Sequence, residues 1–330
     1  MFLWLSLEPC PHPAISCPCS SKNDTLYYVT RLLHEIPRSS PVLLQEEYQA
    51  DLLQITPYEK AVRIRIWWGV LITDYWTSIA YGTLPHISKR FYDVPMPILS
   101  SLVSSKATPA EIYASTCFIH LCGLTELLGD ILPLVYEVNP DRVELKHAVE
   151  RLKSRLNELE RQLPEWFPLP RKPGSSNLWL CFLSMRLLLS RVTLRAAILE
   201  GDTALGQQRL DELRAASSEV LDFVLSLVEH NFLDFWFPYA TQLLVHAVTV
   251  GLRCAVETKD ERVRNECVGR LERVIGHIKW ARDQYDWDVS FLIFLRAFSC
   301  KSLSNRANVR CQIANHTLER CSSPSPNSLL

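Results

Sequence analysis

The 330-residue sequence lacks the motifs that mark most enzymes. Glycine is scarce, with ten residues in the chain, which argues against glycine-rich phosphate loops and against many tight hairpins. The sequence contains no G-x-S-x-G, H-E-x-x-H, P-loop or G-x-G-x-x-G motif. His34-Glu35 begins like a zinc-protease motif, but Arg38 stands where the second zinc ligand should be. We therefore expect no catalytic residues, and we expect that this protein is not an enzyme.

Paired cysteines are missing as well. The chain has eleven cysteines, but none forms a C-x2-C pair, so a structural zinc site has no support. Most of the cysteines in the middle of the chain fall in apolar stretches, where a free thiol behaves as a small buried hydrophobe. These residues are Cys117, Cys122, Cys181 and Cys254. An odd count without a secretory signal indicates reduced thiols in the cytoplasm or nucleus, and we expect no metal and no cofactor.

An excess of one charge is also absent, since the net charge is −1. The basic pairs Lys89-Arg90 and Arg171-Lys172 are too small to form a nucleic-acid footprint. The longest uncharged run, residues 235–252, contains Pro238 and His246, which favours a buried core helix over a membrane span. The sequence therefore predicts no direct DNA contact and no membrane.

Helix signals are strong in the rest of the chain. Thr56-Pro57-Tyr58-Glu59 is a capping box, and Thr108-Pro109-Ala110-Glu111 repeats it. Asn139-Pro140-Asp141 opens a third helix. Leucines and a valine follow at alternating spacings of four and three. This spacing is typical both of a short leucine zipper between two chains and of a helix inside a bundle. We favour packing within the fold over dimerisation. This series comprises Leu145, Val149, Leu152, Leu156, Leu159 and Leu163.

A proline-rich loop at 164–177 divides the helical region. Beyond it, apolar spacing predicts helices near 178–200, 207–230, 237–257 and 261–284. No strand series was found. We predict an all-α fold with one large domain over 25–300. It is flanked by Ser/Pro/Cys-rich tails at 1–24 and 301–330 that we expect to be poorly ordered.

The stretch Arg63–Trp76, RIRIWWGVLITDYW, contains three of the nine tryptophans. Its apolar residues recur from Ile64 at i+3, i+4, i+7 and i+8, which indicates one face of a helix rather than a strand. Trp67 and Trp68 lie on this face, so burial is favoured over a role in stacking on single-stranded nucleic acid. Gly82 suits the residue after the helix. Arg63 and Asp74 lie too far apart to pair, so each should hold a separate neighbour.

The same region resembles the signature of the fungal-specific transcription factor regulatory domain, the middle homology region of binuclear-zinc-cluster regulators. The resemblance is specific over 56–97 and diffuse to about residue 295. The residues that carry it are Arg63, Arg65, Trp67, Trp68, Asp74, Gly82, Pro85, Asp93, Pro95 and Pro97. Two departures stand out: the arginine that the family places between its glycine and proline is missing from Gly82–Pro85, and the six-cysteine zinc cluster is absent from this chain.

The resemblance implies a nuclear transcription regulator that receives a signal from a small-molecule effector or a protein partner. Because the chain has no zinc cluster of its own, it would act through protein partners of the transcription machinery or a DNA-binding partner subunit, or it would be a truncated copy of a full regulator. The signature residues would have a structural or regulatory role. An alternative is a helical accessory protein or enzyme of a biosynthetic pathway, with a small-molecule pocket between helices and a cytoplasmic location.

Overall fold

The computed structural model describes residues 56–167, 172–234, 236–285 and 287. The predicted tails at 1–24 and 301–330 lie outside the described residues, as do both ends of the predicted domain and part of the loop at 164–177. Within the described part, the fold is all-helical and contains no strand, as predicted.

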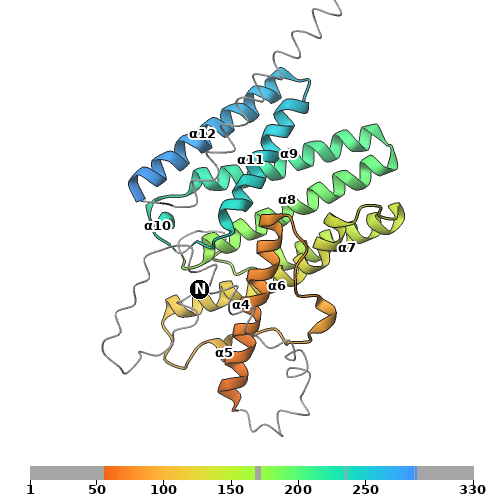
Figure 1. The fold of residues 1–330 in the computed structure, drawn as a ribbon. Coiled ribbons are helices and arrows are strands. Elements are labelled where there is room, and N and C mark those ends of the chain that lie inside the picture. The colour runs from red at the N-terminus through yellow and green to blue at the C-terminus, as the bar shows by residue number, and fades with distance from the viewer. Residues whose placement is uncertain (1–55, 168–171, 235, 286, 288–330) are drawn as a thin grey trace, which may run out of the picture.

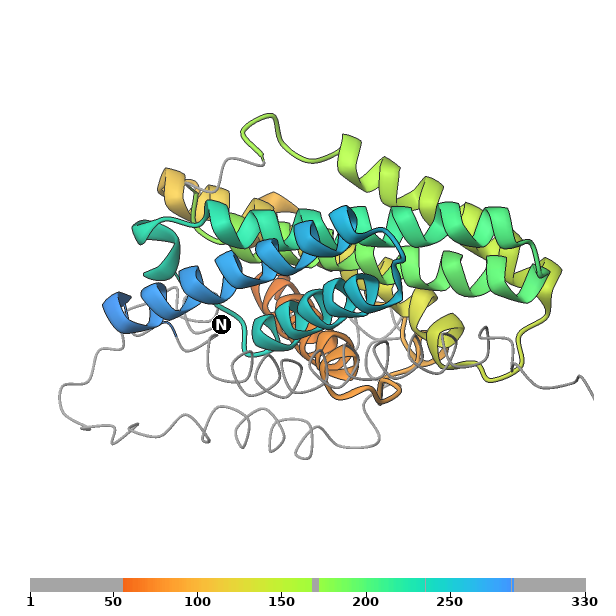
Figure 2. The same ribbon diagram turned by 90° about the horizontal axis from the view of Figure 1, so that it is seen from above.

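The described chain forms nine α-helices and one 3₁₀ helix (Figure 1). In chain order they are α4 (Pro57–Tyr81), η2 (Lys89–Phe91), α5 (Leu99–Leu102), α6 (Pro109–Tyr136), α7 (Arg142–Arg161), α8 (Ser175–Glu200), α9 (Thr203–Ser226), α10 (Glu229–Phe232), α11 (Ala240–Glu257) and α12 (Glu261–Tyr285). Helices α8, α9 and α12 lie roughly along one direction, and α4 crosses α8 steeply (Figures 1 and 2).

The predicted helix starts are confirmed by their caps. The Thr56 hydroxyl accepts from the Glu59 amide, and the Glu59 carboxylate accepts from the Thr56 amide in return. Thr108 and Glu111 make the same reciprocal pair at the start of α6. Asp141 caps α7 by accepting from the Glu144 amide at 2.9 Å. Each cap joins residues three positions apart, so the local sequence is sufficient to specify it.

The predicted helix near 207–230 was placed wrongly at both ends. It begins at Thr203, where the Asp202 carboxylate accepts from the Leu205 amide. It stops at Ser226 because Leu227 and Val228 adopt extended conformations. The Asn231 side chain then accepts from the Val228 amide at 2.9 Å and starts the short helix α10. An asparagine that competes for a backbone donor favours a break of this kind.

Helix α8 is the centre of the fold, as its nearly uniform apolar character predicted. It packs against α6, α7, α9 and α11. Phe182, Met185 and most of its leucines are almost completely buried; these leucines are Leu178, Leu180, Leu183, Leu187, Leu188 and Leu189. The four-three series of α7 also points inward, since Leu145, Val149, Leu152 and Leu156 are buried. Packing within the fold is therefore confirmed for these four residues.

One described helix, α6, is long and apolar enough to cross a membrane by length and composition. Of its most apolar window, 56% is buried inside the fold. It packs against α4, α5, α7 and α8. Much of the apolar surface of α6 is thus buried against neighbouring helices of the core.

Candidate functional site

Asp74 is the polar centre of the signature region. Its side chain is 3% exposed, on the part of α4 that faces the loop after the helix. The carboxylate accepts from the amides of His86 at 3.2 Å and Ile87 at 2.9 Å, and it contacts His86 Nδ1 at 2.8 Å. A buried carboxylate with several donors holds its neighbours firmly, because losing either side leaves a buried polar group unpaired. Asp74 therefore holds a separate neighbour, as predicted, and that neighbour is the loop at 85–88.

The proline-rich segment that follows is fixed to α4 by two further side chains. The buried Trp68 ring donates from Nε1 to the Pro95 carbonyl at 2.9 Å. Arg65 donates from Nη2 to the Ser101 carbonyl at 3.2 Å, and burial lowers the pKa of its guanidinium. Because prolines hold this segment extended and remove backbone donors, side chains of α4 provide its attachment.

The two tryptophans of the signature lie in different surroundings. Trp68 is buried, whereas Trp67 is half-buried and packs against the Tyr92 ring at a centroid distance of 5.6 Å. The Trp67 indole nitrogen is buried and has no hydrogen-bond partner among the described residues. Both rings thus pack on the protein itself, and the predicted burial is confirmed for Trp68 and partial for Trp67.

Helix α4 meets α6 through an unusually close contact. Gly129 lies against Tyr75, and a Cβ added at Gly129 would come within 2.6 Å of the Tyr75 ring. The next residue of α4, Trp76, donates to the hydroxyl of Thr125, one turn before Gly129 on α6, at 2.9 Å in the buried interface. Trp76 also stacks on Tyr239 from the segment before α11, with ring centroids 5.7 Å apart. The signature helix is therefore packed into the core on two sides.

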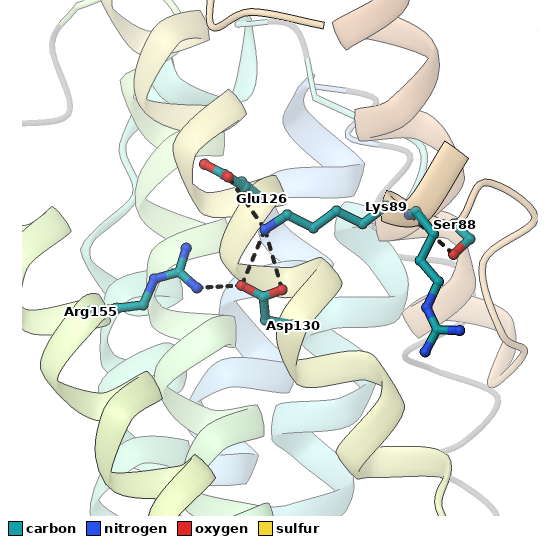
Figure 3. Close-up of polar contacts among 6 residues, drawn as sticks. Ser88, Lys89, Glu126, Asp130 and Arg155 are labelled. Atoms are coloured by element: carbon teal, nitrogen blue, oxygen red, sulfur yellow. Dashed lines mark hydrogen bonds and ion pairs between the residues drawn. The ribbon is translucent and has the colours of Figure 1, made fainter. Parts of the chain in front are cut away.

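A group of charged side chains ties η2 to two other helices (Figure 3). Lys89 Nζ lies 3.3 Å from both Glu126 and Asp130 on α6. Arg155 on α7 also pairs with Asp130. The four side chains are 29 to 46% exposed, so the individual pairs contribute little to stability. Their arrangement nevertheless fixes the position of the loop relative to α6 and α7.

The remaining signature residues divide between the surface and the loop. Arg63, Asp93 and the Pro95 ring are exposed, Pro85 is half-buried and Pro97 is buried. Gly82 has φ +69° and ends α4, a conformation that favours glycine. The structure thus brings Arg65, Trp68, Asp74, Gly82 and the 85–97 segment together, and leaves Arg63 and Asp93 at the surface. We call Asp74, Trp68, Arg65 and the loop contacts they make the signature clamp.

The described residues offer little covalent chemistry. Among them, no group of three or more His, Cys, Asp or Glu side chains could hold a metal ion. The five cysteines in the described ranges are free and buried, and burial raises the pKa of Cys117 to about 12 and that of Cys254 to about 11. Burial lowers the pKa of His120. Protonated thiols and a neutral imidazole in such surroundings are poor nucleophiles and poor general acids.

Several contacts could not be read from the signature. Arg195 reaches across from α8 and donates to the carbonyls of Leu134 and Val138 at 3.2 Å each, at the end of α6. It also donates to the Val135 and Glu137 carbonyls. The only local signal is an arginine recurring along an apolar helix, and its target lies about sixty positions away. The sequence analysis also did not predict the charged group around Asp130, because its members lie far apart in the sequence. These residues are Lys89, Glu126, Asp130 and Arg155.

The described part of the chain is thus a helical body whose most buried polar contacts hold one loop against its core. Residues 20–167 match the family model of the fungal specific transcription factor domain. The signature clamp lies inside this matched segment.

Curated relatives point in the same direction. Two uncharacterised transcriptional regulatory proteins of Schizosaccharomyces pombe are similar to this chain. One is 25% identical over 233 residues, which cover 65% of this chain and 33% of the relative. The other is 22% identical over 264 residues, which cover 72% of this chain and 33% of the relative. The chain thus spans about a third of the length of these relatives. No solved structure matches the chain.

Proposed function

We propose that the chain is the regulatory body of a fungal transcription regulator and acts in the nucleus. The observation that carries the proposal is the domain match over residues 20–167, which contains the signature clamp. The names of the two Schizosaccharomyces pombe relatives support it. In this proposal the chain contributes no catalytic residue and no zinc ligand.

The mechanism we propose is a change in helix packing. The clamp connects the loop at 85–98 to α4, and α4 in turn packs against α5, α6 and α11. An effector or partner that binds one arrangement of these helices better than another would shift the population toward it. A DNA-binding partner subunit would carry that shift to the promoter. Buried contacts suit this role because packed interfaces change between discrete arrangements.

Fusing the full chain to a heterologous DNA-binding domain tests this function directly. The fusion should raise or lower a reporter that carries the matching binding sites, relative to the DNA-binding domain alone at equal protein level. The measurement should be repeated on several carbon and nitrogen sources, because an effector can be required. If the reporter stays at the level of the DNA-binding domain alone under every condition, this chain does not regulate transcription in the proposed way.

A further inference from the structure

A surface groove of about 430 Å³ lies between α8 and α9, and a volume of this size is typical of small-molecule sites. The two helices pack side by side and run in opposite directions (Figures 1 and 2). Each contributes residues from successive turns, so the groove follows one face of both helices for about 10 Å. The lining residues are Trp179, Leu183 and Arg186 on α8 and Glu219, Asp222, Phe223 and Ser226 on α9.

The two ends of the groove differ in their chemistry. Arg186 donates to the Glu219 carboxylate at 2.9 Å, so these two side chains meet at one end. Trp179 lies two turns before Arg186 on α8 and therefore lines the other end. Its ring stacks on Phe182 with the ring centroids 5.3 Å apart. The groove thus has a charged end and an aromatic end.

Arg186 is already neutralised at the charged end. Its Nη1 donates to Glu219 at 2.9 Å, and its Nη2 donates to Glu160 of α7 at 2.8 Å. The guanidinium also lies over the Phe182 ring, 5.2 Å from the ring centroid. An anion that bound Arg186 would have to compete with two carboxylates, so the groove is poorly suited to an acidic ligand.

Carboxylates outnumber arginines around the groove. Asp222 is bound by Arg270 of α12 at 2.9 Å, and Arg270 also lies 3.5 Å from Glu266. The ion pairs that border the groove therefore contain four carboxylates and two arginines, a net charge of −2. This excess of negative charge is complementary to a cation.

Two of these carboxylates can bind a further donor. Glu219 and Asp222 lie three positions apart on α9, which makes their side chains neighbours on one face. Each is about half exposed and can be reached from solvent. Glu219 Oε1 and Asp222 Oδ2 have no hydrogen-bond partner among the described residues. Two adjacent carboxylates repel each other, and a cation between them relieves the repulsion.

We propose that the groove binds an arylalkylammonium ion, which is an aromatic ring joined by a short aliphatic chain to a protonated amine. The ammonium group would donate to Glu219 Oε1 and Asp222 Oδ2. The ring would pack against Trp179 and Leu183 toward the aromatic end. Such an amine keeps its proton at neutral pH, because the pKa of an alkyl amine such as lysine is about 10.4.

The groove is placed where a ligand can influence helix packing. Its ion pairs join α8 to α7 through Glu160 and α9 to α12 through Arg270. An ammonium group at Asp222 competes with Arg270 for the same carboxylate and would favour a different position of α12 against α9. As the input to the regulator, the site rests on the proposed function; binding itself does not.

The test is ligand-induced thermal stabilisation of the full chain by the hydrochlorides of phenethylamine and tryptamine. Phenylethanol has the ring without the charge, and butylamine has the charge without the ring. Both serve as control compounds at equal ionic strength. The two arylalkylamines should raise Tm with increasing concentration, because ligands that bind the folded state stabilise it. The two control compounds should raise it much less.

Asp222→Asn should weaken binding roughly five- to tenfold in isothermal titration calorimetry, the loss of one charge-assisted hydrogen bond. Asp211→Asn is the matched control. Asp211 is also an exposed aspartate of α9 and pairs with an arginine, Arg214, at 3.2 Å, but it does not line the groove. This variant should bind like the wild type.

Equal affinity of the Asp222→Asn variant and the wild type would overturn the site. Equal stabilisation by phenylethanol or by butylamine would overturn the ligand class, and no stabilisation by either arylalkylamine would overturn the whole proposal. A chain that binds the arylalkylamines but never changes the reporter keeps the site and loses the regulatory role.

Discussion

At the residue scale, the two aspartates of the signature have opposite roles. Asp74 is buried and accepts from two backbone amides of the loop, whereas Asp93 is exposed. Both belong to the same sequence pattern, so the sequence alone gives no reason to treat them differently. Burial and hydrogen-bond partners make Asp74 the structural residue of the pair.

Replacing Asp74 by Asn should destabilise the fold by about 2–3 kcal/mol, because an amide accepts less strongly and places its own donors against the loop amides. Asp93→Asn is the control and should change stability by less than about 0.5 kcal/mol. The midpoint of urea unfolding measures both. Equal midpoints for the two variants would show that the clamp does not stabilise the fold.

Gly129 permits a second prediction at this scale. Gly129→Ala places a methyl group against the Tyr75 ring and should cost about 1–3 kcal/mol through overpacking. Gly276→Ala is matched to it, since Gly276 also lies inside a helix and a Cβ there would meet no atom within 4 Å. That variant should gain about 0.5–1 kcal/mol from helix propensity. Thermal unfolding separates the two, and a destabilised Gly276→Ala variant would contradict the packing described here.

At the element scale, what could be predicted depends on how far apart the partners lie in the sequence. Capping boxes join residues three positions apart, so the starts of α4 and α6 follow from the sequence. The contact from Trp68 to Pro95 spans 27 positions and that from Arg195 to Leu134 spans 61. Periodicity shows which face is apolar, but it cannot identify the carbonyl that an arginine reaches. The clamp residues were therefore predictable as a set, and their partners were not.

Arg195 provides the test at this scale. Its guanidinium binds the last carbonyls of α6, which have no helical partner of their own. Arg195→Gln should destabilise the fold by about 1–2 kcal/mol and speed amide hydrogen exchange near residues 134–138. Arg262→Gln, at an exposed position of α12, should leave this exchange unchanged. Identical amide exchange near residues 134–138 in the Arg195→Gln variant and the wild type would show that Arg195 does not cap the end of α6.

At the scale of the whole molecule, the described core extends beyond the matched domain. The match ends at residue 167, whereas α6 and α7 bury their apolar faces against α8, which begins at Ser175. A chain ending at 167 would expose these faces to water. It should lack a cooperative thermal transition by circular dichroism, while the full chain unfolds cooperatively. A cooperative transition in the shorter chain would show that the matched segment is an independent domain.

The reactivity of the buried cysteine thiols provides a second test of how tightly this core is packed. Because burial raises their pKa, the thiols of Cys117 and Cys254 stay protonated near neutral pH, and alkylation requires the thiolate. Iodoacetamide at about pH 8 should label their peptides only after unfolding. A raised thiol pKa also favours the folded state below the ordinary value of about 8.5. That contribution should fall as the pH rises toward the folded-state values. Rapid labelling of the Cys117 and Cys254 peptides in the native chain would contradict the described packing.

We propose that the signature clamp is the structural basis of transcription regulation by this chain. Three reporter fusions at equal protein level test this role: the wild type, Asp93→Asn and Asp74→Asn. The wild type and Asp93→Asn should change reporter output alike, while Asp74→Asn should lose most of the effect. Full activity of the Asp74→Asn fusion, at a level equal to the wild type, would contradict it.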